Sequence, residues 1–584
     1  NFFCYHCATH IIKQLFVFHG RASALLGAIA LVVLINIFTK NDHEDYNNTE
    51  IQVELGTENS YALSMVAGKR AGSARLSGSF RIARSDGYDF NKFVRDTVNF
   101  SEGMPSILKR AIFYNNNEYK NESMAIPVSG KFSYKGFYIG TDSYYQESAK
   151  GLENVSLDYN SQRDHRLFLM NYIGWQKNFK EKHFFNAEYQ RTKEWLWGGQ
   201  PAFRPAIFDS LVKSGRNPNA PITHAEIATY FSEYYSQQDS RGSTRDRVNL
   251  LYQTVAKNDI NLTVGYLFDR LDILGVALSD YDRVPYFNDK TDDKNFLRRP
   301  FFVTTKNALF LQAKKPFFNE KLYTTLGIRY DHHNIYKGVV NLRSGFVFVP
   351  TKDLFIKALF GQAFREPNIF ELGAGNPKGA NLGLKPARMN ALELSITKQF
   401  QDILQLMGTI YRSQITDFIV PFGTNDFTNS KEKQYVVGGE VSAILRYGKW
   451  NADANYTYTN PYDQEYAGQI VNALNNYPHR ANVGVTYDIT KKISLNARIN
   501  YFSKIEAYHG NRNIERLHTI DAFTRLHLTL SSKDIFLGGI LFKGMITVQN
   551  VLNSTDYQPN VRRGGPKQFQ LPGRQVFLRT YFKF

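Results

Sequence analysis

The sequence predicts an all-β protein, a large antiparallel transmembrane β-barrel of about 22 strands. Three observations favour this fold. Apolar and polar residues alternate with a period of two from about residue 50 to the end of the 584-residue chain. Some alternating runs are joined by short turns and others by long polar connections, as at the two rims of such a barrel. Aromatic residues make up 15% of the chain and often end the apolar faces, as in interfacial girdles.

Composition excludes several other classes of protein. The net charge is +18, but the basic residues are scattered and form no nucleic-acid-binding signature, so we expect no nucleic-acid partner. The two cysteines, Cys4 and Cys7, exclude a disulfide framework. Apart from residues 22–38, no segment approaches the roughly 18 apolar residues of a spanning helix, which excludes a polytopic helical membrane protein.

The first element is the uncharged run Ala22–Phe38 within GRASALLGAIALVVLINIFTK. Its second half is rich in β-branched residues and no helix cap precedes it, which indicates a buried strand. Two alternatives stay open. Ala28-Ile29-Ala30 is a nominal cleavage site for a signal peptide. A single inner-membrane anchor is the other alternative, although the run is at the short limit for a spanning helix.

The strands expected after residue 50 are recognised by their alternation. In TLGIRYD, Leu326, Ile328 and Tyr330 share one face, while Arg329 and Asp331 lie on the other. Similar alternation occurs in residues 451–459 and 493–501 and around 185–189, 262–266, 392–396 and 483–487. A soluble sandwich or propeller is disfavoured because the polar faces are charged and amide-rich and no blade-length repeat is visible.

The connections between these strands are of two kinds. We predict short turns at residues 350–354, 446–450 and 488–492, and long polar connections at 86–126, 197–247, 278–303, 365–390 and 503–519. An open sheet edge in lipid would leave backbone groups unpaired, so the sheet must close. A barrel of about 22 strands cannot fill its own lumen with side chains and needs a plug.

The second half of the chain resembles TonB-dependent outer-membrane receptors. The likeness is carried, in order, by GIRYDHHN, NLRSGFVFVPTKDLFIKALFGQAFREPNIFEL, NLGLKPARMNALELS, YPHRANVGVTYDIT, VQNVLNSTDY and the final PGRQVFLRTYFKF. That last segment resembles the family's closing strand. Its aromatic residues Tyr581, Phe582 and Phe584 resemble the signal that the outer-membrane assembly machinery reads.

The apolar run of the N-terminal region resembles the last strand of the family's plug domain, and IKQLFVFHG resembles the strand before it. Departures at Arg21, Leu26, Ile29 and Val33 make the run look more like a helix or a signal sequence than the family pattern does. We therefore expect residues 1–42 to be a remnant of the plug and residues 43–584 to be the barrel with long extracellular loops. Most of a plug and a TonB-contacting segment are missing, so we expect a fragment or truncated product that does not transport actively alone.

Candidate binding residues lie where strands leave the barrel. Arg365 and Glu366 could touch an entering ligand or form a salt-bridged structural corner. In the loop 197–247, THAEIATYFSEYYSQQ predicts a short capped helix that groups Tyr230, Tyr234 and Tyr235 as a ligand platform or as the loop's own core. We expect neither a metal site at Cys4–His10 nor at His332-His333, and no cofactor or catalytic residues.

The resemblance implies import across the outer membrane of a Gram-negative-type bacterium. The expected cargo is a scarce large nutrient, an iron–siderophore first and another metal chelate next; no His lies between Arg365 and Leu384, which argues against haem. Expected partners are the TonB complex through the plug, outer-membrane lipid and lipopolysaccharide, the extracellular metal-chelate ligand and the assembly machinery. Alternatives are a passive porin-like or adhesion barrel, and a soluble β-protein anchored in the inner membrane.

Overall fold

The structure is a computed structural model of the 584-residue chain. It describes residues 12–19, 33–39, 48–88, 122–149, 163–180, 182–198, 241–274, 300–368, 371–372, 381–422, 426–462, 464–466, 469–471, 477–508, 517–559 and 568–584.

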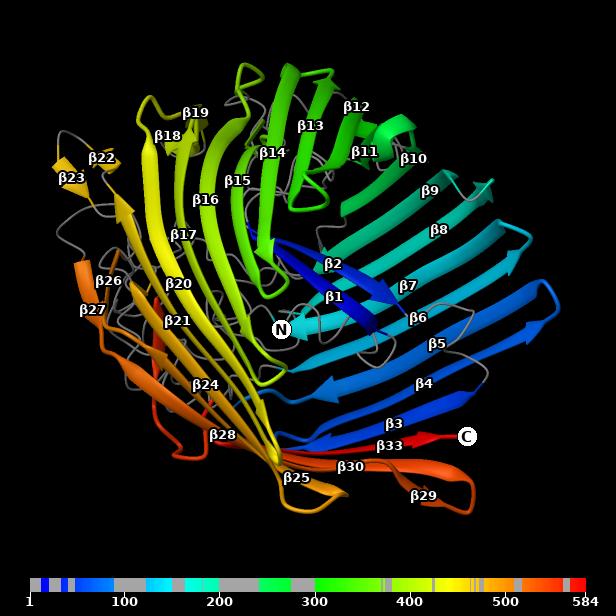
Figure 1. The fold of residues 1–584 in the computed structure, drawn as a ribbon, viewed down its shortest axis with the longest axis vertical. Helices are drawn as coiled ribbons and strands as arrows, with labels where there is room; N and C mark the ends of the chain where they lie inside the picture. The colour runs from blue at the N-terminus through cyan, green and yellow to red at the C-terminus, as the bar shows by residue number, and fades with distance from the viewer. Residues whose placement is uncertain are drawn as a thin grey trace, which may run out of the picture.

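A closed antiparallel barrel accounts for most of the described residues, and it confirms the predicted fold class and strand number (Figure 1). It has 22 strands when β28 and β29, which pair in succession with β30, are counted as one. The first eight are β3 Thr49–Gly56, β4 Ser60–Ala71, β5 Ala74–Ser85, β6 Ser123–Tyr134, β7 Phe137–Ala149, β8 Arg163–Phe179, β9 His183–Gly198 and β10 Arg241–Val255. A short 3-10 turn, Lys257–Asp259, follows β10.

The remaining barrel strands continue around the ring. They are β11 Asn261–Leu274, β12 Pro300–Phe317, β13 Leu322–His333, β14 Lys337–Thr351, β15 Leu354–Arg365, β16 Ala387–Phe400, β17 Leu404–Thr416, β20 Gln434–Tyr447, β21 Trp450–Tyr462, β24 His479–Asp488, β25 Ile493–Phe502, β28 Phe523–Ser532, β29 Ile535–Leu537, β30 Ile540–Gln549 and β33 Gln575–Lys583.

The two rims differ in their connections, as the sequence predicts. On one rim, turns of two to five residues join strands, for example at 352–353, 448–449 and 489–492. The other rim carries most of the long connections. Among the described residues, four of these connections contain a small hairpin: β18 Ile419–Phe422 with β19 Asp426–Asn429, β22 Gln464–Tyr466 with β23 Gln469–Val471, β26 Ile505–Tyr508 with β27 Leu517–Ile520, and β31 Tyr557–Pro559 with β32 Gln568–Gln570.

The last strand closes the ring. β33 pairs with β30 on one side and with β3 on the other, so chain segments more than 500 residues apart lie side by side. Phe582 is opposite Ile51, and its ring centroid lies 5.4 Å from that of Phe542 on β30. The backbone N–H of Phe584 donates to the carbonyl of Thr49 at 2.9 Å. The C-terminal aromatic residues therefore lie at the seam of the barrel.

The two faces of the strands differ sharply in polarity. On β13, Leu326, Ile328 and Tyr330 are 46–53% exposed on the outer surface, whereas Arg329 and Asp331 on the lumen face are at most 1% exposed. This confirms the alternation predicted for TLGIRYD. Large apolar side chains are exposed on the outer face of most strands of the ring. Such a continuous apolar band is the surface that lipid would cover.

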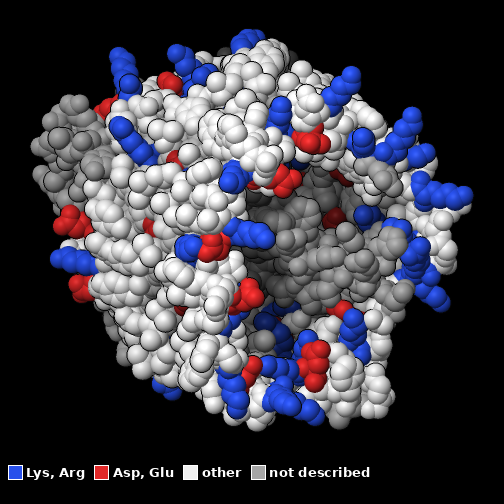
Figure 2. Space-filling view, viewed as in Figure 1, with Lys and Arg blue, Asp and Glu red and all other residues white. Residues whose placement is uncertain are grey.

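Aromatic residues gather near the short-turn rim. Tyr447 and Trp450 flank the turn between β20 and β21 and are 65% and 49% exposed. Phe317 and Phe318 hold the same position at the turn after β12. In Figure 2, Lys and Arg side chains line the right-hand edge of the molecule, beside the turns that follow β4, β6 and β8 in Figure 1. Aromatic and basic residues at one depth are typical of a membrane interface.

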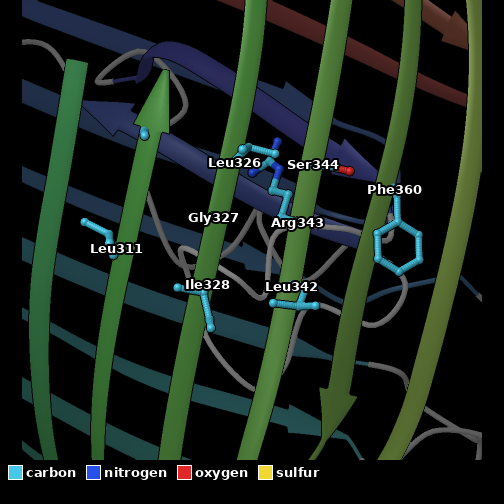
Figure 3. Close-up of a pocket in the computed structure, with 9 residues that line it drawn as sticks. Leu311, Leu326, Gly327, Ile328, Leu342, Arg343, Ser344 and Phe360 are labelled. Atoms are coloured by element: carbon cyan, nitrogen blue, oxygen red, sulfur yellow. The ribbon is translucent and has the colours of Figure 1, made fainter. Parts of the chain in front are cut away.

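A separate antiparallel hairpin lies within the ring of strands in Figure 1, and Figure 3 shows it behind the wall formed by β12–β15. Its strands are β1 Ile12–His19 and β2 Val33–Thr39, paired from Ile12 with Thr39 to His19 with Val33. The end of the apolar run is thus a strand, as its β-branched residues predict; residues 22–32 lie outside the described part of the chain. No helix among the described residues is long and apolar enough to cross a membrane.

Candidate functional site

The lumen side of β10–β15 carries a group of charged residues near the rim with the long connections. We call these residues the rim cluster: Arg245, Arg247, Asp269, Lys306, Arg329, Asp331, His333, Tyr336, Arg365, Glu366 and Glu371. They come from five strands, β10, β11, β12, β13 and β15, and from the segments that follow β13 and β15. Strand alternation brings them to one face, and the antiparallel register places Arg247, Asp269, Lys306 and His333 in one row across four strands.

The corner that follows β15 is held by ion pairs. Arg365 donates from its two terminal nitrogens to the two carboxylate oxygens of Glu371, at 2.9 and 3.0 Å. Glu371 also accepts from the backbone N–H of Asn368 at 2.8 Å, while the Asn368 side chain accepts from the N–H of Glu371 at 2.8 Å. This reciprocal pairing, with the Arg365–Glu371 ion pair, ties Glu371 to Asn368 and to the end of β15. Of the two expectations for Arg365, the geometry matches the structural corner, and a ligand role stays a prediction.

Glu366 is tied to another strand. Lys306 of β12 donates to its carboxylate at 2.8 Å, across 60 positions of sequence. The Lys306 side chain is 10% exposed and that of Glu366 is 25% exposed, so the pair is largely shielded from bulk water. Lys306 is the register partner of His333 on β13. Glu366 therefore joins the corner after β15 to the ends of β12 and β13.

Asp269 on β11 gathers two arginines from β10. Arg245 donates to it at 2.7 Å and Arg247 at 2.8 Å. The Asp269 side chain is 5% exposed, whereas the guanidinium groups are about one third exposed. One buried carboxylate thus holds two cations whose outer faces remain open to the lumen.

The Arg329–Asp331 pair on β13 is more deeply buried. Arg329 donates from two nitrogens to the two oxygens of Asp331, both at 2.8 Å. Its guanidinium carbon also lies 5.7 Å from the ring centroid of Phe310 on β12. A bidentate, stacked arginine of this kind is rigid, and lysine could not replace its geometry.

His333 and Tyr336 cover the top of the cluster. Their rings stack with centroids 4.2 Å apart at 8°, and Tyr336 packs against Phe364. His333 Nδ1 accepts from the backbone N–H of Ile335 at 3.1 Å, so the neutral ring carries its proton on Nε2. Burial, followed by the nearby negative charge of Glu366, raises the pKa of Tyr336 in the β13–β14 turn. Tyr336 is therefore neutral at any physiological pH.

The other predicted residues fall into two sets. Tyr230, Tyr234 and Tyr235, with the Cys4–His10 segment, lie outside the described residues. Tyr581, Phe582 and Phe584 lie at the barrel seam, far along the chain from the rim cluster. Within the described ranges no group of three or more His, Cys, Asp or Glu residues could hold a metal ion.

Sequence reasoning missed most members of the rim cluster. Period-two alternation places Arg329 and Asp331 on the lumen face, but it says nothing of which neighbouring strand lies beside them. Lys306 and Asp269 could have been found only with the register of β11, β12 and β13. Glu371 lies in a connection, where no periodic signal exists.

The fold and this charged lumen define the class of protein: a wide closed β-barrel with an apolar outer wall. The chain belongs to the TonB-dependent receptor-like β-barrel family, because the family model "TonB dependent receptor-like, beta-barrel" matches residues 39–539. The resemblance inferred from sequence is thereby confirmed. A curated relative, heme/hemopexin utilization protein C of Haemophilus influenzae, is 23% identical over 296 residues, which are 41% of this chain and 40% of that protein.

Solved structures show the same fold at low identity. The ferric enterobactin receptor PfeA of Pseudomonas aeruginosa has a TM-score of 0.76 at 14% identity and covers 99% of this chain and 87% of its own. The siderophore receptor PirA of Acinetobacter baumannii scores 0.75 at 13% identity, covering 99% and 86%. The FrpB iron transporter of Neisseria meningitidis scores 0.71 at 13% identity, covering 98% and 88%.

Proposed function

We propose that the protein imports a scarce iron chelate, a ferric siderophore first, across the outer membrane of a Gram-negative-type bacterium with energy from TonB. Family membership is the observation that carries this proposal. The barrel is of the class that encloses a plugged lumen, because 22 strands leave more space than wall side chains can fill.

The proposal includes a plug contribution from residues 1–42, with residues 43–584 as the barrel. The β1–β2 hairpin within the ring of strands supports it (Figure 1). TonB would act on the plug, and the ligand would enter from the rim with the long connections.

The rim cluster is the candidate ligand face. Its arginines Arg245 and Arg247 both form ion pairs with the buried Asp269, and their side chains are about one third exposed. They therefore offer positive charge in a fixed position to an anionic ferric chelate. Glu366 reaches the same cluster through Lys306, and Arg365 lies at the corner after β15. Tyr230, Tyr234 and Tyr235 remain candidate ligand contacts from the loop before β10. Arginine is over-represented where paired N–H donors recognise carboxylate or phosphate groups, so this geometry suits an anionic ligand.

Haem is the second candidate cargo, because the curated relative is named for heme and hemopexin utilization. The single histidine of the rim cluster does not favour haem. His333 is 5% exposed, and its Nδ1 already accepts a backbone hydrogen bond. A haem-iron ligand needs an accessible nitrogen lone pair. The siderophore cargo is therefore preferred.

Ligand binding by the purified chain tests the cargo. We would follow tryptophan fluorescence while adding ferric catecholate and ferric hydroxamate siderophores, haem and cobalamin. The proposal expects saturable binding of a ferric siderophore and weaker binding of haem. Binding of none of the four, together with large open currents in planar bilayers, would instead support the passive porin-like barrel.

Two variants separate the roles of Arg365. Glu371→Gln removes the charge that holds Arg365, whereas Arg365→Gln removes the cation itself. If Arg365 touches the ligand, Arg365→Gln weakens siderophore binding about tenfold, since a charge-assisted contact contributes about 1.5 kcal/mol, and Glu371→Gln weakens it less. Equal losses in both variants would assign Arg365 to the structural corner alone.

A further inference from the structure

The outer, lipid-facing wall of the barrel contains a hollow of about 400 Å³ between β12 and β15 (Figure 3). Small side chains at Ala313 of β12 and Ser344 of β14 leave this space. The rest of its outward lining is apolar and comes from Leu311, Leu326, Ile328, Leu342 and Phe360. The four aliphatic residues among these are 44–53% exposed, so the hollow opens outward.

The register explains why the hollow forms here. Ala313 pairs with Leu326, Leu326 with Ser344, and Ser344 with Phe360, so these residues form one row across four strands. Two small residues in a row of otherwise large apolar side chains leave a depression. An empty depression would lose dispersion contacts on its open side, so a flexible apolar occupant is favoured.

A lysine, Lys315, lies on the same face of β12, two residues closer than Ala313 to the short-turn rim. Lys315 stands over the ring of Phe317, with Nζ 4.9 Å from the centroid. Phe317 belongs to the aromatic residues at this rim and is 39% exposed. No carboxylate of the described residues forms an ion pair with Lys315. Its ammonium therefore lies at the depth of lipid headgroups with its charge uncompensated by the described part of the protein.

Two other strands repeat the lysine–phenylalanine pair and show what is special on β12. Lys177 lies 5.1 Å from the Phe179 ring on β8, and Lys398 lies 5.8 Å from the Phe400 ring on β16. Trp175 occupies on β8 the position that Ala313 has on β12. Lys398 is already paired with Asp353. Of these three strands, only β12 joins an uncompensated lysine to a hollow.

We propose that this hollow and Lys315 form a binding site for one anionic glycerophospholipid of the leaflet on the short-turn side. One acyl chain fills the hollow over Ala313 and Ser344, and the phosphate contacts Lys315. The site rests on the membrane placement in the proposed function. In lipid there is no hydrophobic gain from burial, so shape and charge select the occupant. Short turns of such barrels face the inner leaflet, where phospholipid rather than lipopolysaccharide is the available phosphate lipid.

Native mass spectrometry of the full chain in detergent, with added phosphatidylglycerol, tests the site. Lys315→Gln should lower the occupancy of the tightest-bound lipid about fivefold, which corresponds to about 1 kcal/mol per lysine at an anionic lipid surface. Ser344→Phe should lower it similarly by filling the hollow, and Ser344→Ala should leave it unchanged. Lys177→Gln is the matched control, because its lysine and phenylalanine are alike but Trp175 leaves no hollow.

Three results would overturn the site. They are equal losses in Lys177→Gln and Lys315→Gln, unchanged occupancy in Ser344→Phe, and preferential binding of purified lipid A over phosphatidylglycerol. A mass corresponding to two chains that disappears in Ser344→Phe would assign the hollow to a second copy instead.

Each variant must keep its heat-dependent shift on an SDS gel and its siderophore binding. A wild-type chain that binds siderophore but shows no preference for phosphatidylglycerol refutes this site alone, whereas a wild-type chain that binds no siderophore refutes the proposed function.

Discussion

At the scale of single residues, the lumen wall is organised by carboxylates that hold arginines in place. Asp269 is the clearest case, because one buried carboxylate accepts from both Arg245 and Arg247. Removing it leaves two cations side by side without their common partner. Ion pairs of this kind matter when one member is buried, whereas exposed pairs contribute little.

Asp269→Asn should therefore destabilise the barrel by about 2 kcal/mol, less than for a fully buried pair because the arginines are partly exposed. On an SDS gel, the temperature at which the folded, faster-migrating band is lost would fall. Asp272→Asn is the control, since Asp272 pairs with Arg270, whose side chain is 47% exposed. Equal shifts in the two variants would show that Asp269 has no special role.

At the scale of elements, adjacent strands fit together through glycines that receive an aromatic ring. Gly265 on β11 is the register partner of Phe310 on β12, and a Cβ at Gly265 would clash with the Phe310 ring. The Arg329 guanidinium carbon lies 5.7 Å from the centroid of the same ring. Glycine is required here by close approach and not by backbone conformation.

Gly265→Val should displace the Phe310 ring and loosen Arg329, at a cost of about 1–3 kcal/mol. The comparison is Gly408→Val on β17, where a Cβ would meet nothing within 4 Å and where valine favours the strand. Refolding yield and unfolding temperature of both variants measure the difference. An unchanged refolding yield and unfolding temperature in Gly265→Val would mean that the Phe310 ring can move aside without loss of stability.

Period-two alternation predicts the strands because each barrel strand faces lipid on one side and a polar lumen on the other. The turns at 350–354, 446–450 and 488–492 are predicted for the same reason, since alternation stops there. Alternation does not predict which side chains contact one another. Arg365 with Glu371 and Lys306 with Glu366 depend on a connection and on strand register, and neither leaves a periodic signal.

At the scale of the whole molecule, one seam closes the barrel between its first and last strands. Phe584 donates its N–H to Thr49, and its side chain is 52% exposed on the outer face. An exposed terminal ring adds little to packing within the barrel. We therefore infer that its role is recognition by the assembly machinery.

Phe584→Ala should leave refolding in detergent nearly unchanged, because the Thr49 hydrogen bond uses the backbone. The amount of folded protein in the outer membrane of expressing cells should fall several-fold. The two yields would be compared by heat-shifted bands on the same gel. A loss in detergent as large as the loss in cells would assign Phe584 to barrel stability.

The central claim is that alternate residues of the barrel strands face lipid and the lumen. Nitroxide labels placed one at a time from Leu326 to Asp331 on β13, with Cys4 and Cys7 replaced by serine, test it most directly. In lipid vesicles, labels at Leu326, Ile328 and Tyr330 should be accessible to oxygen, and labels at Arg329 and Asp331 should not. A series with no period of two, in which every label is shielded from oxygen and water alike, would contradict the claim.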